Sequence, residues 1–146
     1  MSHRAAIFLV EDGRIALIER YKQGVHYFSF PGGHVEAGES PLEAAVREAK
    51  EELGLDVRLI REIAHMFWRG RWQHYYLAER LGGTFGLGNG PEMYRPVEVS
   101  GTYHPTWLSV EELTSQPVRP PEVAERVKGW AVEGWPENSV IVEEKN

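Results

Sequence analysis

The stretch of sequence that decides the fold is GHVEAGESPLEAAVREAKEELGL, residues 33–55. Residues 40–43 (Ser-Pro-Leu-Glu) have the form of a helix capping box with proline at the first helical position. Gly54 stands where a left-handed residue commonly ends a helix. Between these signals, apolar residues recur at helical spacing: Leu42, Ala45, Val46, Ala49 and Leu53. The pattern predicts an amphipathic helix over residues 41–53, with these five side chains on one stripe.

Three glutamates gather on one side of this helix, beside the apolar stripe. Glu48 and Glu52 lie one turn apart, and Glu51 is adjacent to both. Like charges at this spacing repel each other by roughly a few tenths of a kcal/mol per pair. A divalent cation with oxygen ligands would compensate them. The alternative is an ordinary solvated helix face, on which Arg47 or Lys50 neutralises the acids.

The same segment resembles the Nudix box, the loop–helix–loop motif of a family that hydrolyses nucleoside diphosphates linked to another moiety. The fixed positions of the motif are filled by Gly33, Glu39, Arg47, Glu48, Glu51, Glu52 and Gly54. Its two apolar positions hold Ala49, which is smaller than the usual aliphatic residue, and Leu55. The preceding Phe30-Pro31-Gly32 is also similar to the family's approach to the box.

This resemblance implies an α/β fold, the Nudix-type α/β/α sandwich, with a mixed β-sheet flanked by helices. Strand-like and helix-like segments are interspersed along the chain, which suits such an architecture. No linker-like stretch or internal repeat divides the sequence. We therefore expect one Nudix hydrolase domain over residues 1–146.

The resemblance also implies the site chemistry. Glu48 and Glu52 would be the principal ligands of Mg²⁺ or Mn²⁺, with Glu51 as the third carboxylate and the Gly32 carbonyl as a further ligand. Bound metal would neutralise charge on the diphosphate while water attacks phosphorus, releasing a nucleoside monophosphate and a phosphorylated product. The remaining motif residues have structural roles: Glu39 and Arg47 pair to hold the loop against the helix, and Gly33 and Gly54 shape the backbone.

A fourth catalytic carboxylate in the family often comes from a downstream loop. Residues 82–101 are rich in glycine and predict a long loop, a feature that is often functional. Glu92 and Glu98 are the candidates in it. We favour Glu92, because Gly90 and Pro91 restrict the backbone beside it; a solvated loop acid is the alternative.

Two further groups of residues are candidates for substrate binding. Arg69, Arg71 and Trp72 cluster at the tip of a predicted hairpin, where arginine can meet phosphate and tryptophan can stack on a base. His26 precedes the motif in an aromatic run and is a candidate for the base pocket. Solvated arginines at a hairpin tip and core packing of the aromatic run are the alternatives.

The rest of the chain predicts a series of short elements. Asp12-Gly13 predicts a hairpin between the runs 4–10 and 14–19. After it we expect a looser segment over 20–26, a short strand over 27–30, and a sharp turn at Pro31-Gly32-Gly33. Further strands are expected over 56–68, 72–81 and 103–108, and helices after a capping box at 109–112 and over 122–132. Residues 140–142 either pair with a sheet edge or remain loose.

Composition narrows the function further. The 146 residues contain no cysteine, which excludes disulfides, thiolate zinc sites and a cysteine nucleophile. No P-loop motif occurs, and the longest apolar run near the start, residues 5–10, is too short for a signal peptide or a membrane span. A cytoplasmic protein without a membrane partner is therefore expected. The net charge of −6 argues against a long nucleic acid, but not against a small nucleotide-diphosphate substrate.

Two functions remain open at this point: a metal-dependent nucleotide diphosphate hydrolase, and a Nudix-fold module that binds or senses a nucleotide without turnover. All three helix glutamates are present, which favours catalysis. A hydrolase acting on RNA ends is disfavoured by the acidic balance and the lack of a basic tract. The sequence does not identify the nucleotide, and a homodimer is possible.

Overall fold

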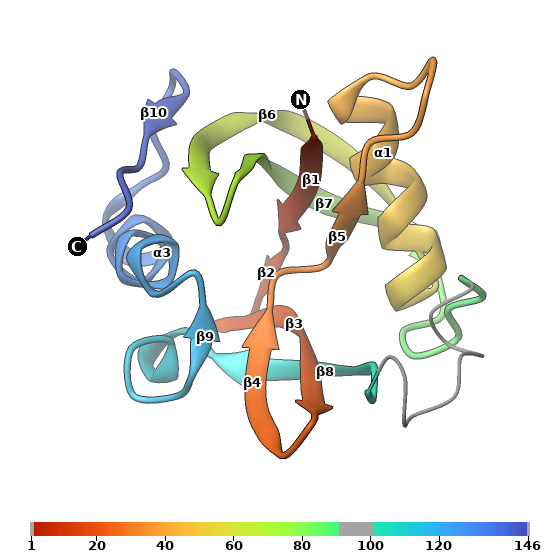
Figure 1. The fold of residues 1–146 in the computed structure, drawn as a ribbon, viewed down its shortest axis with the longest axis horizontal. Coiled ribbons are helices and arrows are strands. Elements are labelled where there is room, and N and C mark those ends of the chain that lie inside the picture. The colour runs from red at the N-terminus through yellow and green to blue at the C-terminus, as the bar shows by residue number, and fades with distance from the viewer. Residues whose placement is uncertain (1, 91–100, 146) are drawn as a thin grey trace.

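The computed structural model describes residues 2–90 and 101–145, which form two β-sheets with flanking helices (Figure 1). The first sheet has the order β10-β6-β7-β1-β5. Its strands are β1 (His3–Phe8), β5 (Gly32–His34), β6 (Leu55–Trp68), β7 (Arg71–Gly83) and β10 (Val140–Ile141). β1 runs parallel to β7 and antiparallel to β5, so the sheet is mixed.

The second sheet is built around one long strand, β3 (Arg14–Lys22). β3 pairs antiparallel with the other strands that contact it, β2 (Val10–Glu11), β4 (Val25–Ser29) and β8 (His104–Ser109). A two-residue strand, β9 (Val118–Arg119), joins the far edge of β4 in parallel.

Helices cover both faces of the first sheet. Alternate β1 residues separate the two cores: Ala5 and Ile7 pack with helix α1 (Pro41–Glu48), whereas Ala6 and Phe8 pack with helix α3 (Pro121–Glu133). Successive side chains of a strand point to opposite faces, so the two helices lie on opposite sides of the sheet (Figure 1). The expected α/β/α sandwich is confirmed. No helix within the described residues is long and apolar enough to cross a membrane.

The main helix forms as expected but ends differently. Both hydrogen bonds of the capping box are present: Glu43 N–H donates to Ser40 Oγ, and Ser40 N–H donates to the Glu43 carboxylate. After Glu48 the helix widens into a π-helical turn, η1 (Ala49–Leu53), and Gly54 ends it in the left-handed conformation. The sequence indicated the two ends of the helix but not the π-turn.

The buried face of this helix was predicted incorrectly in part. Leu42 and Val46 were placed on the buried stripe, yet they are 51% and 37% exposed. The face against the sheet instead consists of Ala44, Ala45, Glu48, Ala49, Glu52 and Leu53. Small alanines allow the helix to approach β1 closely, and the two glutamates lie on the buried face rather than beside it.

The first hairpin is confirmed in part, because only Val10 and Glu11 of the run 4–10 pair with β3 while residues 3–8 form β1 of the first sheet, and the next hairpin corrects an expectation. Asp12 and Gly13 both have positive φ and connect β2 to β3. The segment 20–26, predicted to be loose, is a second hairpin: β3 continues to Lys22, and Gln23 and Gly24 turn the chain, again with positive φ at both residues. The Gln-Gly pair is a weaker turn signal than Asp-Gly, which explains the error.

Pro31-Gly32-Gly33 also differs from the predicted sharp turn, because Gly32 and Gly33 belong to strand β5. A Cβ at Gly32 would collide with the Ala5 carbonyl of β1, so glycine permits close packing between the strands here.

Ser109 makes no side-chain capping bond, and the expected helix after it is a 3₁₀ turn, η3 (Val110–Glu112). The strands expected over 56–68, 72–81 and 103–108 and the helix expected over 122–132 are confirmed, and residues 140–141 pair with β6. The loop expected over 82–101 begins only after β7 ends at Gly83, and its residues 91–100 lie outside the described residues.

Candidate active site

The motif glutamates are held between the main helix and strand β5. Glu48 and Glu52 are only 7% and 5% exposed. The Gly32 N–H donates a 2.8 Å hydrogen bond to Glu52 Oε1. A Cβ at Gly33 would lie 2.5–2.8 Å from the Glu48 carboxylate group. The backbone of the two glycines of β5 therefore packs directly against both carboxylates.

Arg47 connects strand β5 to the loop before the helix. Its guanidinium donates to both carboxylate oxygens of Glu39, at 2.8 and 3.1 Å, and to the His34 carbonyl at 3.0 Å. The hydrogen bond from Arg47 holds the pKa of Glu39 below its ordinary value, and Glu39 in turn raises the pKa of Arg47. The pairing of Glu39 with Arg47 that the resemblance implied is thus present in the geometry.

The same guanidinium also reaches two of the candidate metal ligands. Its Nη1 donates to Glu48 Oε1 at 2.8 Å and to Glu51 Oε2 at 2.6 Å. Burying carboxylates without a cation nearby would be costly, so in this arrangement Arg47 provides the compensating charge. Both interpretations of the glutamate cluster have support here: Glu48 and Glu52 are buried, and an arginine partly neutralises Glu48 and Glu51.

The chemistry of the donor set fits a hard divalent cation, although the set is not gathered around one point. Buried carboxylates beside backbone that a side chain cannot enter are oxygen ligands of the kind that Mg²⁺ and Mn²⁺ prefer. Within residues 2–90 and 101–145, no three Asp, Glu or His side chains are arranged to hold an ion as they stand. Glu48 and Glu51 contact Arg47 in this arrangement, so both would reorient toward a cation.

A cavity of about 260 Å³ opens over the glutamates. Its acidic lining consists of Glu36, Glu48, Glu51 and Glu52, and its basic lining of Arg4, Arg20 and Arg47. Gly32 and Gly33 line it as well. The candidate metal ligands Gly32, Glu48, Glu51 and Glu52 therefore line the same cavity, together with arginines that can meet phosphate oxygens.

Gly54 brings the loop after β7 against the end of the glutamate helix. Its φ is +78°, and a Cβ there would lie 2.5 Å from the Thr84 carbonyl oxygen. Gly86 N–H donates to the Leu53 carbonyl, and Gly90 N–H donates to the Glu51 carbonyl. The loop is thereby attached to the helix end as far as Gly90. The candidate loop carboxylates, Glu92 and Glu98, lie outside the described residues.

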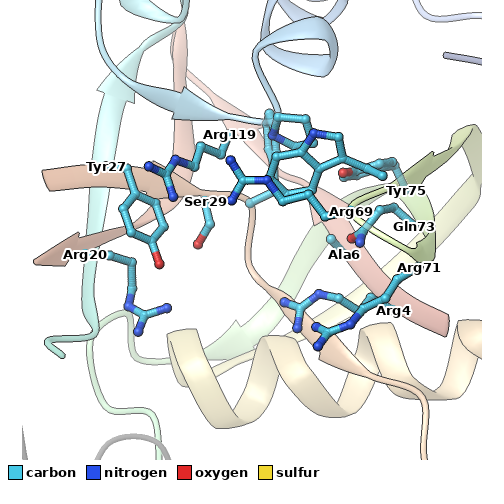
Figure 2. Close-up of a pocket in the computed structure, with 13 residues that line it drawn as sticks. Arg4, Ala6, Arg20, Tyr27, Ser29, Arg69, Arg71, Gln73, Tyr75 and Arg119 are labelled. Atoms are coloured by element: carbon cyan, nitrogen blue, oxygen red, sulfur yellow. The ribbon is translucent and has the colours of Figure 1, made fainter. Parts of the chain in front are cut away.

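A second cavity, of about 320 Å³, adjoins the first and shares Arg4, Arg20 and Ser29 with it (Figure 2). The structure brings the predicted substrate residues Arg69 and Arg71 into its lining. It does not bring Trp72 or His26 there. Trp72 packs edge-on against Phe67, and the neighbouring Trp68 lines the cavity in its place.

His26 is occupied on the outer part of the second sheet. Its Nε2 lies 2.8 Å from a Glu19 carboxylate oxygen, and its ring stacks on Tyr21 with centroids 4.4 Å apart. Both contacts come from strand β3, paired with the strand that carries His26. The histidine therefore has a local structural explanation.

Sequence reasoning missed several cavity residues that come from distant parts of the chain: Arg4, Arg20, Gln73 and Arg119. Arg20 carried a signal that was available. It follows buried Ile18 at a spacing of two in a strand and is itself 9% exposed. A charged residue at an inward strand position indicates a polar site. The others required knowledge of which strands are neighbours.

Comparisons with known proteins agree with this geometry. The family model described as NUDIX domain matches residues 1–128. The chain is 35% identical over 71 residues to a bis(5′-nucleosyl)-tetraphosphatase (asymmetrical) of Sus scrofa, covering 43% of this chain and 48% of that protein. It is 39% identical over 71 residues to an RNA pyrophosphohydrolase of Halorhodospira halophila, covering 49% of this chain and 36% of that protein.

Among solved structures, an ADP-ribose pyrophosphatase from Streptococcus suis has the same fold. The TM-score is 0.68 at 21% identity, with 98% of each chain covered. At this identity the likeness establishes the fold alone. The chain spans about half or less of the length of the tetraphosphatase and the RNA pyrophosphohydrolase.

Proposed function

Because the chain belongs to the Nudix family, we propose that it is a metal-dependent hydrolase that cleaves the diphosphate linkage of a small nucleotide derivative. The products are a nucleoside monophosphate and the remaining phosphorylated group. The observation that carries this proposal is the cavity over Glu48 and Glu52, where buried carboxylates face arginines across a space open to a ligand.

In this proposal Glu48 and Glu52 are the principal metal ligands, with Glu51 and the Gly32 carbonyl completing the protein's share. These residues would hold Mg²⁺ or Mn²⁺, which would supply the positive charge that attack by water on phosphorus requires. Gly32 N–H holds Glu52 in place through its hydrogen bond. Arg47 holds the loop of Glu39 against the helix. Glu48 and Glu51, which contact Arg47 in this structure, would turn from Arg47 toward the cation.

Other residues of the chain would position the substrate. Arg4 and Arg20 line both cavities, so they lie where a diphosphate would pass from one to the other. Arginine binds phosphate oxygens through its fixed fork of N–H donors. We also propose Glu92 as the loop carboxylate, because it follows by two residues a glycine that is bonded to the Glu51 carbonyl.

The names of the related proteins support the reaction class but differ in substrate. They name a dinucleoside tetraphosphate, RNA and ADP-ribose. The net charge of −6 favours a small substrate over long RNA. We therefore propose a small nucleotide partner. A homodimer and a cytoplasmic location stay predictions.

A nucleotide-binding module without turnover is the second candidate, and one observation favours it. Arg47 donates hydrogen bonds to Glu48 and Glu51, so the positive charge that compensates these acids comes from the protein itself. If that arrangement persisted with Mg²⁺ present, nucleotide would bind without being hydrolysed.

Incubation with Mg²⁺ and a panel of nucleotides, followed by chromatography of the products, separates these candidates. The panel contains ADP-ribose, coenzyme A, diadenosine tetraphosphate, nucleoside triphosphates and a short 5′-triphosphorylated RNA. The hydrolase proposal expects at least one small compound to be cleaved at its phosphate anhydride linkage, releasing a nucleoside monophosphate or, from coenzyme A, adenosine 3′,5′-bisphosphate. Binding without products supports the sensing module, and turnover of the RNA alone contradicts a small substrate.

A further inference from the structure

The larger cavity is strongly basic. It lies between the two sheets: β1, β7 and the β6–β7 turn form one wall, and β3, β4 and β9 form the other. Five arginines line it, and no Asp or Glu of the described residues does. Figure 2 shows Arg20 and Arg119 beside Tyr27 on one side, with Arg4, Arg71 and Gln73 opposite. A chain with a net charge of −6 has concentrated positive charge in one place.

Two of these arginines are held by aromatic rings rather than by acids. The Arg69 guanidinium lies 4.3 Å from the centre of the Trp68 ring, and that of Arg119 lies 4.1 Å from the centre of the Tyr27 ring. Stacking orients the guanidinium plane but leaves its charge and its N–H edges available. Neither arginine has a carboxylate partner within residues 2–90 and 101–145.

These two arginines are separate from the glutamate cluster. Arg4, Arg20 and Ser29 line both cavities, whereas Arg69 and Arg119 line only the basic one. The diphosphate that is cleaved must lie over Glu48 and Glu52, so Arg69 and Arg119 face another part of the substrate. A nucleobase or ribose carries no charge to balance two oriented guanidinium groups, whereas a phosphate group does.

We propose that Arg69 and Arg119 bind a substrate phosphate other than the two of the cleaved linkage. This inference deepens the proposed function and rests on it for the position of the cleaved diphosphate. The favoured substrate is then a nucleotide derivative with an additional phosphate, either on a sugar or along an extended polyphosphate chain. The same compound without that phosphate would be a poor ligand.

Matched pairs of ligands test this directly. The pairs are coenzyme A with 3′-dephosphocoenzyme A, ADP-ribose 2′-phosphate with ADP-ribose, and diadenosine tetraphosphate with diadenosine diphosphate. Dissociation constants are measured by titration calorimetry in EDTA, and kcat/KM is measured with Mg²⁺. For at least one pair we expect the parent protein to bind the more phosphorylated member about tenfold more tightly or better.

The variants are Arg69→Gln and Arg119→Gln, with Arg126→Gln as the control. Glutamine is suited to position 69, because Gln23 occupies the equivalent hairpin turn with the same φ of 51°. Arg126 is an exposed arginine over the Trp130 ring, outside either cavity. Far-ultraviolet circular dichroism and thermal melts establish that each variant is folded.

We expect each cavity variant to lose most of the preference within the responsive pair, and Arg126→Gln to keep it. Equal binding of both members in all three pairs overturns the proposal, as does a preference that both cavity variants retain. Selective binding without turnover of any ligand contradicts the hydrolase proposal and leaves this inference supported. Turnover with equal binding of both members of every pair supports the hydrolase proposal and contradicts this inference.

Discussion

Glu52 is either a metal ligand or a structural acid, and removing its charge distinguishes the two roles. Glu52→Gln keeps the Oε1 atom that accepts the Gly32 N–H bond but removes the negative charge. If the cluster holds a cation, kcat at saturating Mg²⁺ should fall about a thousandfold. In EDTA the variant should melt no lower than the parent, because it has one charge fewer among neighbouring acids. Steady-state assays and thermal melts measure the two quantities.

A matched substitution, Glu133→Gln, controls for the loss of charge elsewhere. Glu133 is exposed at the end of α3 and lines neither cavity, so this variant should keep parental kcat. Near-parental kcat in Glu52→Gln together with a lower melting temperature would instead identify Glu52 as a structural residue.

Arg47 joins the loop of Glu39 to the buried Glu48 and the half-buried Glu51, so its removal should affect stability first. Arg47→Ala removes the bonds to Glu39, His34, Glu48 and Glu51. We expect a loss of about 2 kcal/mol in the free energy of unfolding, because hydrogen bonds to charged groups are lost, and a lower kcat. Chemical denaturation measures the first quantity. A variant that lost activity but kept parental stability and metal affinity would indicate that Arg47 contacts the substrate directly.

The pairing of Glu39 with Arg47 also predicts a dependence of stability on pH. The pKa of Glu39 lies below its ordinary value of 4.5, chiefly because of its hydrogen bond with Arg47. The pair is therefore fully stabilising above that value, and its contribution is lost as the pH falls through the lowered pKa. The melting temperature of the parent should exceed that of Glu39→Gln at pH 7, and the gap should narrow below pH 4.5. A gap that is constant down to pH 3 would contradict this assignment.

At the scale of elements, the contact between β5 and the glutamate helix is the feature most sensitive to a single methyl group. A Cβ at Gly33 would lie 2.5 Å from the Glu48 carboxylate carbon. Gly33→Ala should therefore displace Glu48 and lower kcat by about tenfold or more, since small misplacements of reacting groups are costly. Steady-state kinetics measure the loss.

Gly38→Ala is the control for Gly33→Ala. Gly38 has a φ of +80°, yet nothing lies within 4 Å of a Cβ built there. This variant should be less stable because of backbone strain but should keep parental kcat when folded. Equal kinetic losses in both variants would show that backbone strain, not contact with Glu48, is responsible.

Local signals in the sequence predicted most of the elements. The Ser40 capping box, Gly54 and the Asp12-Gly13 turn each act through a few neighbouring residues, and each one is present in the structure. The three acids of the cluster followed from helical spacing together with the family resemblance. These features depend on contacts within one element, which a single sequence contains.

The errors arose where contacts between elements decide the outcome. The apolar pattern placed Leu42 and Val46 on the buried face, but close approach to β1 buries alanines and two glutamates there instead. Gly32 and Gly33 looked like a turn because no sequence signal showed their pairing with β1. The basic cavity combines residues as far apart as Arg4 and Arg119, and only the meeting of the two sheets brings them together.

At the scale of the whole molecule, charge is separated between two adjoining cavities. Four acids and three arginines line the cavity over the helix, whereas five arginines and no acid of the described residues line the other. The net charge of −6 averages over this separation and conceals it. A metal-bound diphosphate suits the first cavity, and an additional phosphate suits the second. Each cavity would thus take a different part of one substrate.

The central claim is that the buried glutamates act through a divalent cation. The most direct test is the rate of nucleotide hydrolysis by the parent protein in excess EDTA and again after Mg²⁺ is restored, using the best substrate of the panel. We expect negligible turnover in EDTA and recovery with Mg²⁺, because without a cation the charge that grows on the attacked phosphate is not neutralised. Undiminished turnover in excess chelator would contradict the claim.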